Sequence, residues 1–355
     1  MQSITIVGAG ILGACLASRL ARASVGVTVL EKASSVGGVA TARSFAWLNA
    51  SWGNAEPYHH LRVASLSEWR RLSTEVEGIA PNWCGSVLWD LPEAELRRSI
   101  PIHQGWGYNV ELVDAAFTAR AEPALRAPPE VAIHAPDEGM IEPVEATEAF
   151  LRDAQACGAS LHLGADVDHL VETDAKVTGV ALSDGTVIAS DHVVLAAGAG
   201  TGRLTQPLGL SLPLEAPPGL LVLTEPLDKL LNGLVISPLV HVRQRPDGRL
   251  IAGTDFAGAD PGNDPDGVAQ GIIDEIGKLI DAPSDIRMES YTVGYRPTPS
   301  DGVSIAGGIA PGLTVAVTHS GLTLAPILAK LLATEIMTGH RDPLIGPFGP
   351  DRFAQ

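Results

Sequence analysis

The chain has 355 residues, with 24 Lys and Arg against 41 Asp and Glu, which gives a formal net charge of −17. Hydrophobic residues make up 45% and charged residues 18%, the composition of a globular protein that buries a sizeable core. So acidic a chain lacks the positive field that nucleic acids and anionic membranes require, and we expect neither as a partner. The sequence contains no uninterrupted apolar run of 18 residues, so we expect no membrane span. The first residues do not resemble a signal peptide.

The three cysteines, Cys15, Cys84 and Cys157, lie far apart and form no C-x-x-C pair. We therefore expect neither a disulfide framework nor a zinc site, and a reducing, cytoplasmic setting. His59 and His60 are adjacent, which is not the spacing of metal ligands on a helix. The sequence predicts no metal site and leaves the oligomeric state open.

The N-terminal segment predicts a strand, a glycine loop, a helix and a second strand. Residues 4–7 and 27–30 are short apolar runs typical of buried strands, and residues 11–23 have helical periodicity. This order is the repeating unit of a doubly wound parallel sheet.

The loop between the first strand and the helix carries a dinucleotide-binding fingerprint. Residues 8–13 read GAGILG, a G-x-G-x-x-G pattern, and Glu31 ends the next strand. Gly8 would allow the tight turn, Gly10 the approach of a pyrophosphate, and Gly13 close packing of the helix on the strand. The helix N-terminus would bind the phosphates, and Glu31 the ribose hydroxyls. The alternative is a glycine-rich turn that binds nothing.

The rest of the chain alternates between helical and strand patterns, as though two mixed regions were interleaved. Proline-rich connecting loops are expected over 123–136. Helices are predicted over 65–77, from about 92, and over 143–157, 268–280 and 325–337. Strands are predicted over 82–89, 160–163, 177–182, 187–189, 192–197, 219–224, 250–254 and 313–317.

Two further features favour FAD over NAD as the dinucleotide. Gly37 and Gly38 follow Glu31 closely and lead into the polar segment 41–44, which could follow an elongated cofactor. The strand at 192–197 ends in Ala-Ala-Gly, a pattern that often closes over a flavin dinucleotide.

Taken in order, these motifs resemble the D-amino-acid oxidase superfamily, and more narrowly its glycine oxidase, sarcosine oxidase and D-amino-acid dehydrogenase group. Besides the fingerprint, the resemblance rests on residues 40–49 and 194–201 and on two C-terminal stretches. Residues 294–302, GYRPTPSDG, are similar to the family's G-x-R-P-x-x-x-D-G stretch. Residues 318–326, THSGLTLAP, are similar to its glycine turn and helix start beside the flavin ring. The resemblance covers nearly the whole chain.

The resemblance implies an α/β protein in which a Rossmann-like FAD-binding domain is interleaved with an antiparallel-sheet substrate domain. We assign residues 1–80, 140–213 and 297–355 to the first domain and 81–139 and 214–296 to the second. In sarcosine oxidases a cysteine just before the C-terminal region links to the flavin. The cysteines of this chain lie elsewhere, so noncovalent FAD is expected.

We expect the cofactor to be contacted by residues from these motifs. They are Gly8, Gly10, Ile11, Leu12, Gly13, Glu31, Lys32, Thr41, Ala42, Arg43, Ser44, Val167, Ala197, Gly198, Gly321, Leu322 and Thr323.

Four residues are expected at the substrate. Arg296 falls where the family's carboxylate-binding arginine stands, although it could instead hold turn carbonyls. His241 aligns with the family's tyrosine over the substrate, and a solvated strand histidine is the alternative. His319 lies where glycine oxidases usually carry another arginine. It could donate to the flavin edge or supply positive charge there, or be a turn histidine bonded to backbone. Asn49 could face the flavin ring.

The resemblance implies oxidation of the C–N bond of an amino acid or N-substituted glycine. A hydride would pass from the α-carbon to flavin N5, the imine would hydrolyse, and O₂ would reoxidise the flavin to give H₂O₂. No side chain is required as an acid or base, because the amine lone pair drives hydride departure. The alternatives are a D-amino-acid or 2-hydroxy-acid dehydrogenase with another acceptor, a non-catalytic flavin-binding subunit, and a disfavoured NAD-linked reductase.

Overall fold

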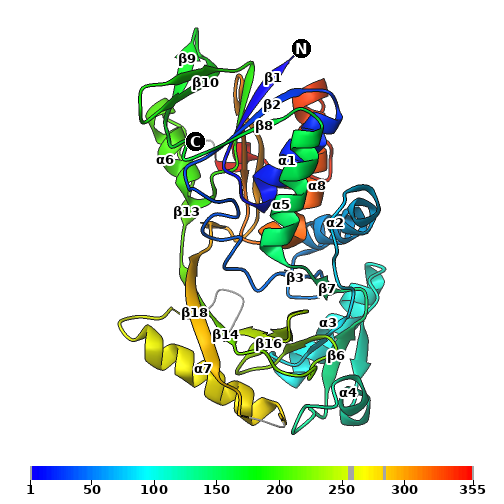
Figure 1. Ribbon diagram of the computed structural model, residues 1–355. Coiled ribbons are helices and arrows are strands. Elements are labelled where there is room, and N and C mark those ends of the chain that lie inside the picture. The colour runs from blue at the N-terminus through cyan, green and yellow to red at the C-terminus, as the bar shows by residue number, and fades with distance from the viewer. Residues whose placement is uncertain (1, 255–259, 283–284, 354–355) are drawn as a thin grey trace.

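Two large sheets organise the molecule (Figure 1). The computed structural model describes residues 2–254, 260–282 and 285–353. The first sheet has six strands in the order β20-β21-β12-β1-β2-β8, all parallel except the edge strand β20. Their bounds are β1 Ser3–Val7, β2 Gly26–Glu31, β8 Ser160–Leu163, β12 His192–Leu195, β20 Ile305–Ala310 and β21 Leu313–Val317.

Both faces of the six-stranded sheet are covered, which is why its strands read as continuous apolar runs. Ile4 and Ile6 pack in one core cluster with α1 (Ile11–Arg22), α5 (Pro143–Ala156) and α8 (Gly321–Thr338). Val7 and Leu195 pack on the other face, in a cluster with a small three-stranded sheet. Its strands are β9 Val167–Thr173, β10 Lys176–Leu182 and β11 Val187–Ala189.

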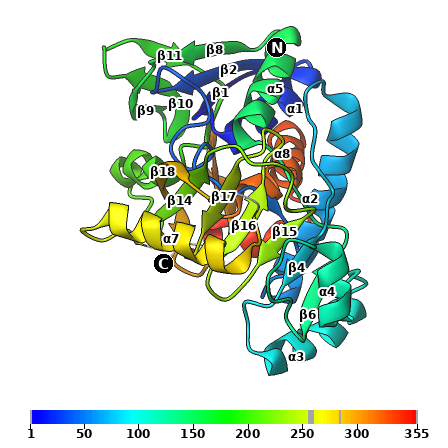
Figure 2. The same ribbon diagram turned by 60° about the horizontal axis from the view of Figure 1, so that its bottom comes forward.

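The second sheet has eight strands in the order β18-β14-β17-β16-β15-β4-β6-β5. Every pairing in it is antiparallel except that of β4 with β15. Helix α7 (Pro265–Leu279) packs against it and lies in front of β14, β16 and β17 in Figure 2. The strand bounds are β4 Ser86–Leu88, β5 Glu111–Val113, β6 Ala132–Ala135, β14 Pro218–Thr224, β15 Leu234–Ile236, β16 His241–Gln244, β17 Leu250–Gly253 and β18 Met288–Tyr295.

Smaller elements connect the two sheets. Two short strand pairs join distant parts of the chain, and the remaining α-helices are α2, α3, α4 and α6. The strands are β3 Trp47–Leu48 with β7 Gly139–Met140, and β13 Leu214–Glu215 with β19 Thr298–Pro299. The helices are α2 Glu56–Glu75, α3 Glu93–Gly105, α4 Ala115–Ala121 and α6 Thr201–Thr205.

The predicted α/β architecture with an interleaved second sheet is confirmed, whereas the exact domain boundaries stay a prediction. Some element predictions are wrong. Residues 132–135, expected in connecting loops, form β6, and α8 begins at Gly321 rather than 325. Helix α2 begins at Glu56, well before the predicted start at residue 65. The prediction missed its first turns because they bury polar side chains such as His59 and Arg62, which hide the apolar periodicity.

By length and composition, helix α8 could cross a membrane, although its sequence contains no uninterrupted apolar run of 18 residues. Pro326, Lys330 and Glu335 interrupt that run. The helix is nevertheless 61% buried inside the protein, where it belongs to the core cluster of α1. Its apolar composition is therefore that of a core helix, and one such helix is weak grounds for a membrane span.

The pH dependence of stability can be predicted at His192, at the start of β12. Its Nε2 lies 2.8 Å from Thr314 Oγ1, and burial, with Lys176 nearby, lowers its pKa to about 4. Between pH 6.5 and 4 the unfolded chain binds this proton and the folded chain does not, so stability falls as pH falls through that window. The slope is up to about 1.4 kcal/mol per pH unit. Replacing His192 by Gln should reduce the slope of urea-unfolding free energy against pH. Parallel curves for the two proteins would contradict this.

Candidate functional site

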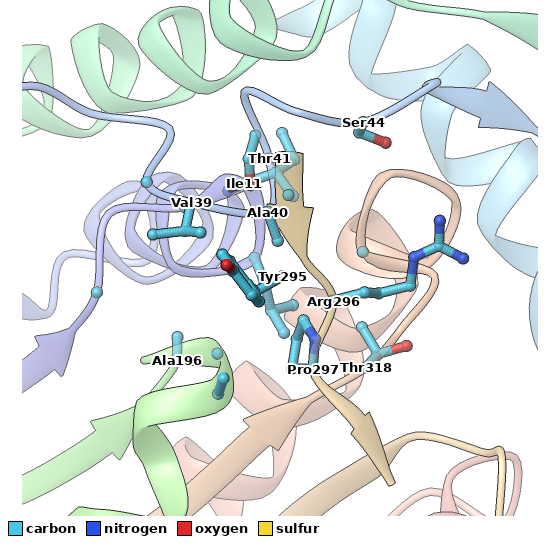
Figure 3. Close-up of a pocket in the computed structure, with 18 of the residues that line it drawn as sticks. Ile11, Val39, Ala40, Thr41, Ser44, Ala196, Tyr295, Arg296, Pro297 and Thr318 are labelled. Carbon is cyan, nitrogen blue, oxygen red and sulfur yellow. Dashed lines mark hydrogen bonds between the residues drawn. The ribbon is translucent and has the colours of Figure 1, made fainter. Parts of the chain in front are cut away.

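A cavity of about 860 Å³ lies between the glycine loop and the eight-stranded sheet (Figure 3). Its walls come from segments far apart in the sequence. The loop before α1 and residues 30–49 form one side, and residues 196–200 another. The end of β18, His241 of β16, the start of α8 and residues 165–167 also line it. The cavity therefore collects the motifs on which the family resemblance rests.

At the glycine loop, side chains are excluded by the backbone. Gly8 has a φ of +108°, and a Cβ there would lie 2.5 Å from the carbonyl oxygen of Ala196. A Cβ on Gly13 would overlap the carbonyl oxygen of Gly8. Gly13 does not line the cavity. Its role is thus the close packing of helix on strand that the fingerprint predicts.

The α1 end of the cavity has the groups that a dinucleotide requires. The N-cap residue Gly10 has no side chain to cap the helix, and Thr41 Oγ1 accepts only the Ile11 N–H, at 3.2 Å, so the N-terminus still presents a positive dipole end to the cavity. The buried carboxylate of Glu31 accepts backbone N–H groups from Ala9 at 2.9 Å and Ala33 at 3.0 Å. These bonds hold an acceptor at the end of β2, where a ribose would lie. This part of the cavity therefore fits the dinucleotide portion of FAD.

The predicted cofactor residues all line this cavity except two, Gly13 and Ala42. Ala42 is exposed, and its N–H donates to the carbonyl oxygen of Gly37 at 3.1 Å, so the residue belongs to the turn rather than to the wall. The contacts of the others with FAD stay predictions.

All four predicted substrate residues line the cavity. Arg296 is half-buried at the end of β18, and in Figure 3 its side chain points to the opposite side of the strand from that of Tyr295. His241 is 4% exposed, so the solvated alternative for this residue is wrong. Its Nε2 lies 3.7 Å from Asp90 Oδ2, which also accepts the Trp52 indole N–H at 3.0 Å. Burial raises the pKa of Asp90.

His319 is a neutral histidine held by its neighbours. Burial, together with the charges of Arg62 and Arg296, lowers its pKa to about 4. Its Nε2 lies 2.8 Å from the carbonyl oxygen of Gly302, and its Nδ1 lies 3.1 Å from Ser320 Oγ. The interpretation in which it supplies positive charge does not fit, and the backbone-bonded alternative describes it better.

Sequence reasoning missed Arg62, which is 5% exposed and lines the same end of the cavity. Its Nε donates to the Asn49 carbonyl oxygen at 2.9 Å, its Nη2 to Asn49 Oδ1 at 2.6 Å, and its Nη1 to Ser320 Oγ at 2.8 Å. A prediction that α2 begins at Glu56 would have placed this arginine on a buried helix face. The only available signal was the Glu-Pro pair at 56–57, a common helix start.

Substitution at Gly10 tests the dinucleotide end. Gly10 has a φ of −75°, and a Cβ there would lie 3.2 Å from Thr41 Oγ1, so Gly10→Ala should fold. The methyl group enters the space through which the backbone would approach the pyrophosphate, and we expect FAD affinity to fall at least tenfold. Titration of apoprotein with FAD measures this. Gly105→Ala, at the end of α3 with nothing within 4 Å of the added Cβ, is the control. Equal affinity in both variants would contradict the prediction.

Comparison with known proteins agrees with this geometry. The family model described as "DAO: FAD dependent oxidoreductase" matches residues 3–335. Glycine oxidase of Pseudomonas aeruginosa is 25% identical, over 98% of this chain and 97% of that protein. One of the subunits of opine oxidase from Agrobacterium tumefaciens is 27% identical, over 99% and 97%. The crystal structure of L-proline dehydrogenase from P. horikoshii matches with a TM-score of 0.90 and 24% identity, over 99% and 97%, and so shares the fold. The chain therefore belongs to the DAO family of FAD-dependent oxidoreductases, which confirms the predicted cofactor and the predicted class of enzyme.

Proposed function

We propose that this enzyme oxidises the C–N bond of a glycine-type amino acid or an N-substituted glycine. Similarity to a glycine oxidase and to part of an opine oxidase supports oxidation of amines or amino acids. The observation that carries the proposal is Arg296 in the cavity wall. The acidic residues that line the cavity, in the described part of the chain, are Glu31 and Asp166, and the residue before Asp166 donates its backbone N–H to the Glu31 carbonyl oxygen. A substrate carboxylate beside Arg296 thus meets a cation and no lining carboxylate.

The roles of the protein groups follow from their chemistry. Bound FAD supplies the acceptor for a hydride, and the protein supplies orientation and electrostatics. The planar guanidinium of Arg296 suits bidentate binding of a carboxylate, which fixes the α-carbon relative to the flavin. His241, held beside Asp90, and Asn49, held by Arg62, would complete a pocket of fixed shape around the amine. Such positioning is itself a large part of catalysis.

Two further parts of the proposal concern the cysteines. None of Cys15, Cys84 and Cys157 is among the cavity-lining residues in the described part of the chain, so a cysteine link to the flavin has no donor there. We therefore propose noncovalent FAD. All three are free, and burial raises the pKa of Cys15 and that of Cys84, which keeps these two as thiols. This pattern supports a reducing, cytoplasmic setting.

The role of Arg296 can be tested with a matched pair of ligands, glycine and glycinamide. The amide keeps the amine and the α-carbon but lacks the charge that a guanidinium binds. In Arg296→Met we expect the KM for glycine to rise about 10- to 100-fold, the size of a charge-assisted hydrogen bond, and the KM for glycinamide to change little. Arg97→Met, at an exposed arginine of α3, is the control. An equal preference for glycine over glycinamide in wild type and Arg296→Met would refute the assignment.

The reaction class is tested by mixing the purified holoprotein anaerobically with glycine, sarcosine, N-alkylglycines, D-alanine, D-proline and 2-hydroxyglutarate. We expect glycine-type amines to bleach the visible absorbance of oxidised flavin, and air to restore it with formation of H₂O₂. Bleaching by the hydroxy acid alone would move the enzyme to the dehydrogenase alternative. Bleaching by amines without peroxide under air would leave amine oxidation with another acceptor. No bleaching by any member would favour the flavin-binding subunit.

A further inference from the structure

The most unusual charge in the cavity wall is that of Arg62. An arginine stays protonated even though burial lowers its pKa, so this guanidinium is a cation inside the protein. No carboxylate lies within ion-pair distance of it among the residues that the structure describes. Its three hydrogen-bond acceptors, two on Asn49 and one on Ser320, are all neutral. The Tyr58 ring lies 5.8 Å from the guanidinium carbon, but a buried cation without a counter-charge is still costly and calls for an anionic partner.

Arg243, the second buried arginine among the residues whose burial the structure describes, shows the contrast. It is fully buried at β16, and its Nη1 donates to Glu142 Oε1 at 2.8 Å, so its charge is neutralised within the protein. Arg243 does not line the cavity, whereas Arg62 does. Through space, the groups that raise the pKa of Arg62 are first the Tyr58 hydroxyl and then Glu138, whose carboxylate already accepts hydrogen bonds from several donors.

A second positive feature converges on the same place. Ser320, which accepts the Arg62 bond, is the N-cap residue of α8, and its side chain caps no backbone N–H of the helix. The first turn of this 18-residue helix, Gly321–Thr323, lines the cavity. The positive end of the helix dipole and the guanidinium therefore lie together in the cavity wall.

Two anions could use this charge, a substrate carboxylate or the flavin ring itself. Arg62 is 5% exposed, whereas Arg296 is half-buried at the wall. A substrate that exchanges at every turnover is better served by the accessible Arg296. A charge that is fixed in the wall and almost fully buried suits a resident group, and flavin electronics are tuned by charge near the ring.

We infer that Arg62 is the built-in counter-charge for the flavin, stabilising the negative charge that the ring system carries when it is reduced. Asn49 and Ser320 hold the guanidinium in place, and the start of α8 adds to its field. This inference needs only bound FAD and does not rest on the substrate proposed above.

Sulfite binding tests this without substrate. Sulfite forms a bond from its sulfur to flavin N5, and the π pair of the N5=C4a bond moves toward N1 and the C2 carbonyl, so the adduct carries the negative charge in question. We expect Arg62→Gln holoprotein to bind sulfite at least tenfold more weakly than wild type. An equal change in the equilibrium constant of the two-electron reduction lowers the flavin potential by about 30 mV.

Two further variants separate charge from structure. Arg62→Lys keeps the charge but loses the fork that grips Asn49, and should keep sulfite affinity within about threefold. Asn49→Asp keeps the side-chain shape and the contact with Arg62, but its carboxylate neutralises the guanidinium charge. This variant should therefore lower the sulfite affinity as much as Arg62→Gln does. Asn49→Asp also decides the matter if Arg62→Gln fails to fold or to bind FAD. Equal loss in Arg62→Lys and Arg62→Gln would show a purely structural role and overturn the inference. Unchanged sulfite affinity in Arg62→Gln and Asn49→Asp would overturn it too, and a raised KM for glycine would then assign Arg62 to the substrate.

Discussion

The short segment from Trp47 to Ser51 is held between two buried charges, and the site depends on this arrangement. From one side, fully buried Glu138 accepts the backbone N–H groups of Ala50 and Ser51 at 2.9 Å and the Trp47 indole N–H at 2.9 Å. From the other side, Arg62 donates to the backbone and side chain of Asn49. Buried polar groups are stabilising only when they are fully hydrogen-bonded. Glu138 and Arg62 supply hydrogen bonds that the polar groups of this buried segment need.

A further set of hydrogen bonds connects α2, the start of α8 and the segment at Trp47. Helix α2 holds the first turn of α8 through polar contacts, since Ser65 Oγ donates to the Thr323 carbonyl oxygen at 2.6 Å and Trp69 Nε1 to that of Leu322 at 2.8 Å. Thr323 Oγ1 in turn donates to the Trp47 carbonyl oxygen at 3.0 Å. The wall is thus rigid where a flavin needs a fixed environment, and its stiffness comes from hydrogen bonds made by residues that a hydropathy pattern counts as polar.

The cavity is electrically divided, and this division gives each end a separate task. At the α1 end, Glu31 offers an acceptor beside a helix N-terminus, which suits sugar hydroxyls and phosphates. Around His319, burial and then the charges of Arg62 and Arg296 lower the pKa of the imidazole, so a neutral ring stands among cations. A protein with a net charge of −17 has therefore placed a local excess of positive charge where its chemistry would use negative ligands.

The sequence by itself determined the dinucleotide fold and much of its site, because those functions rest on local features. Gly8 needs its positive φ, and Glu31 stands a fixed distance along a β-α-β unit, so spacing along the chain is enough to recognise them. The family motifs likewise placed Arg296 and His241 in one cavity. Only the tertiary structure decided that His241 is buried beside Asp90 and that, among the described residues, no carboxylate forms an ion pair with Arg62. Burial and charge pairing depend on contacts between residues distant in sequence, which periodicity cannot report.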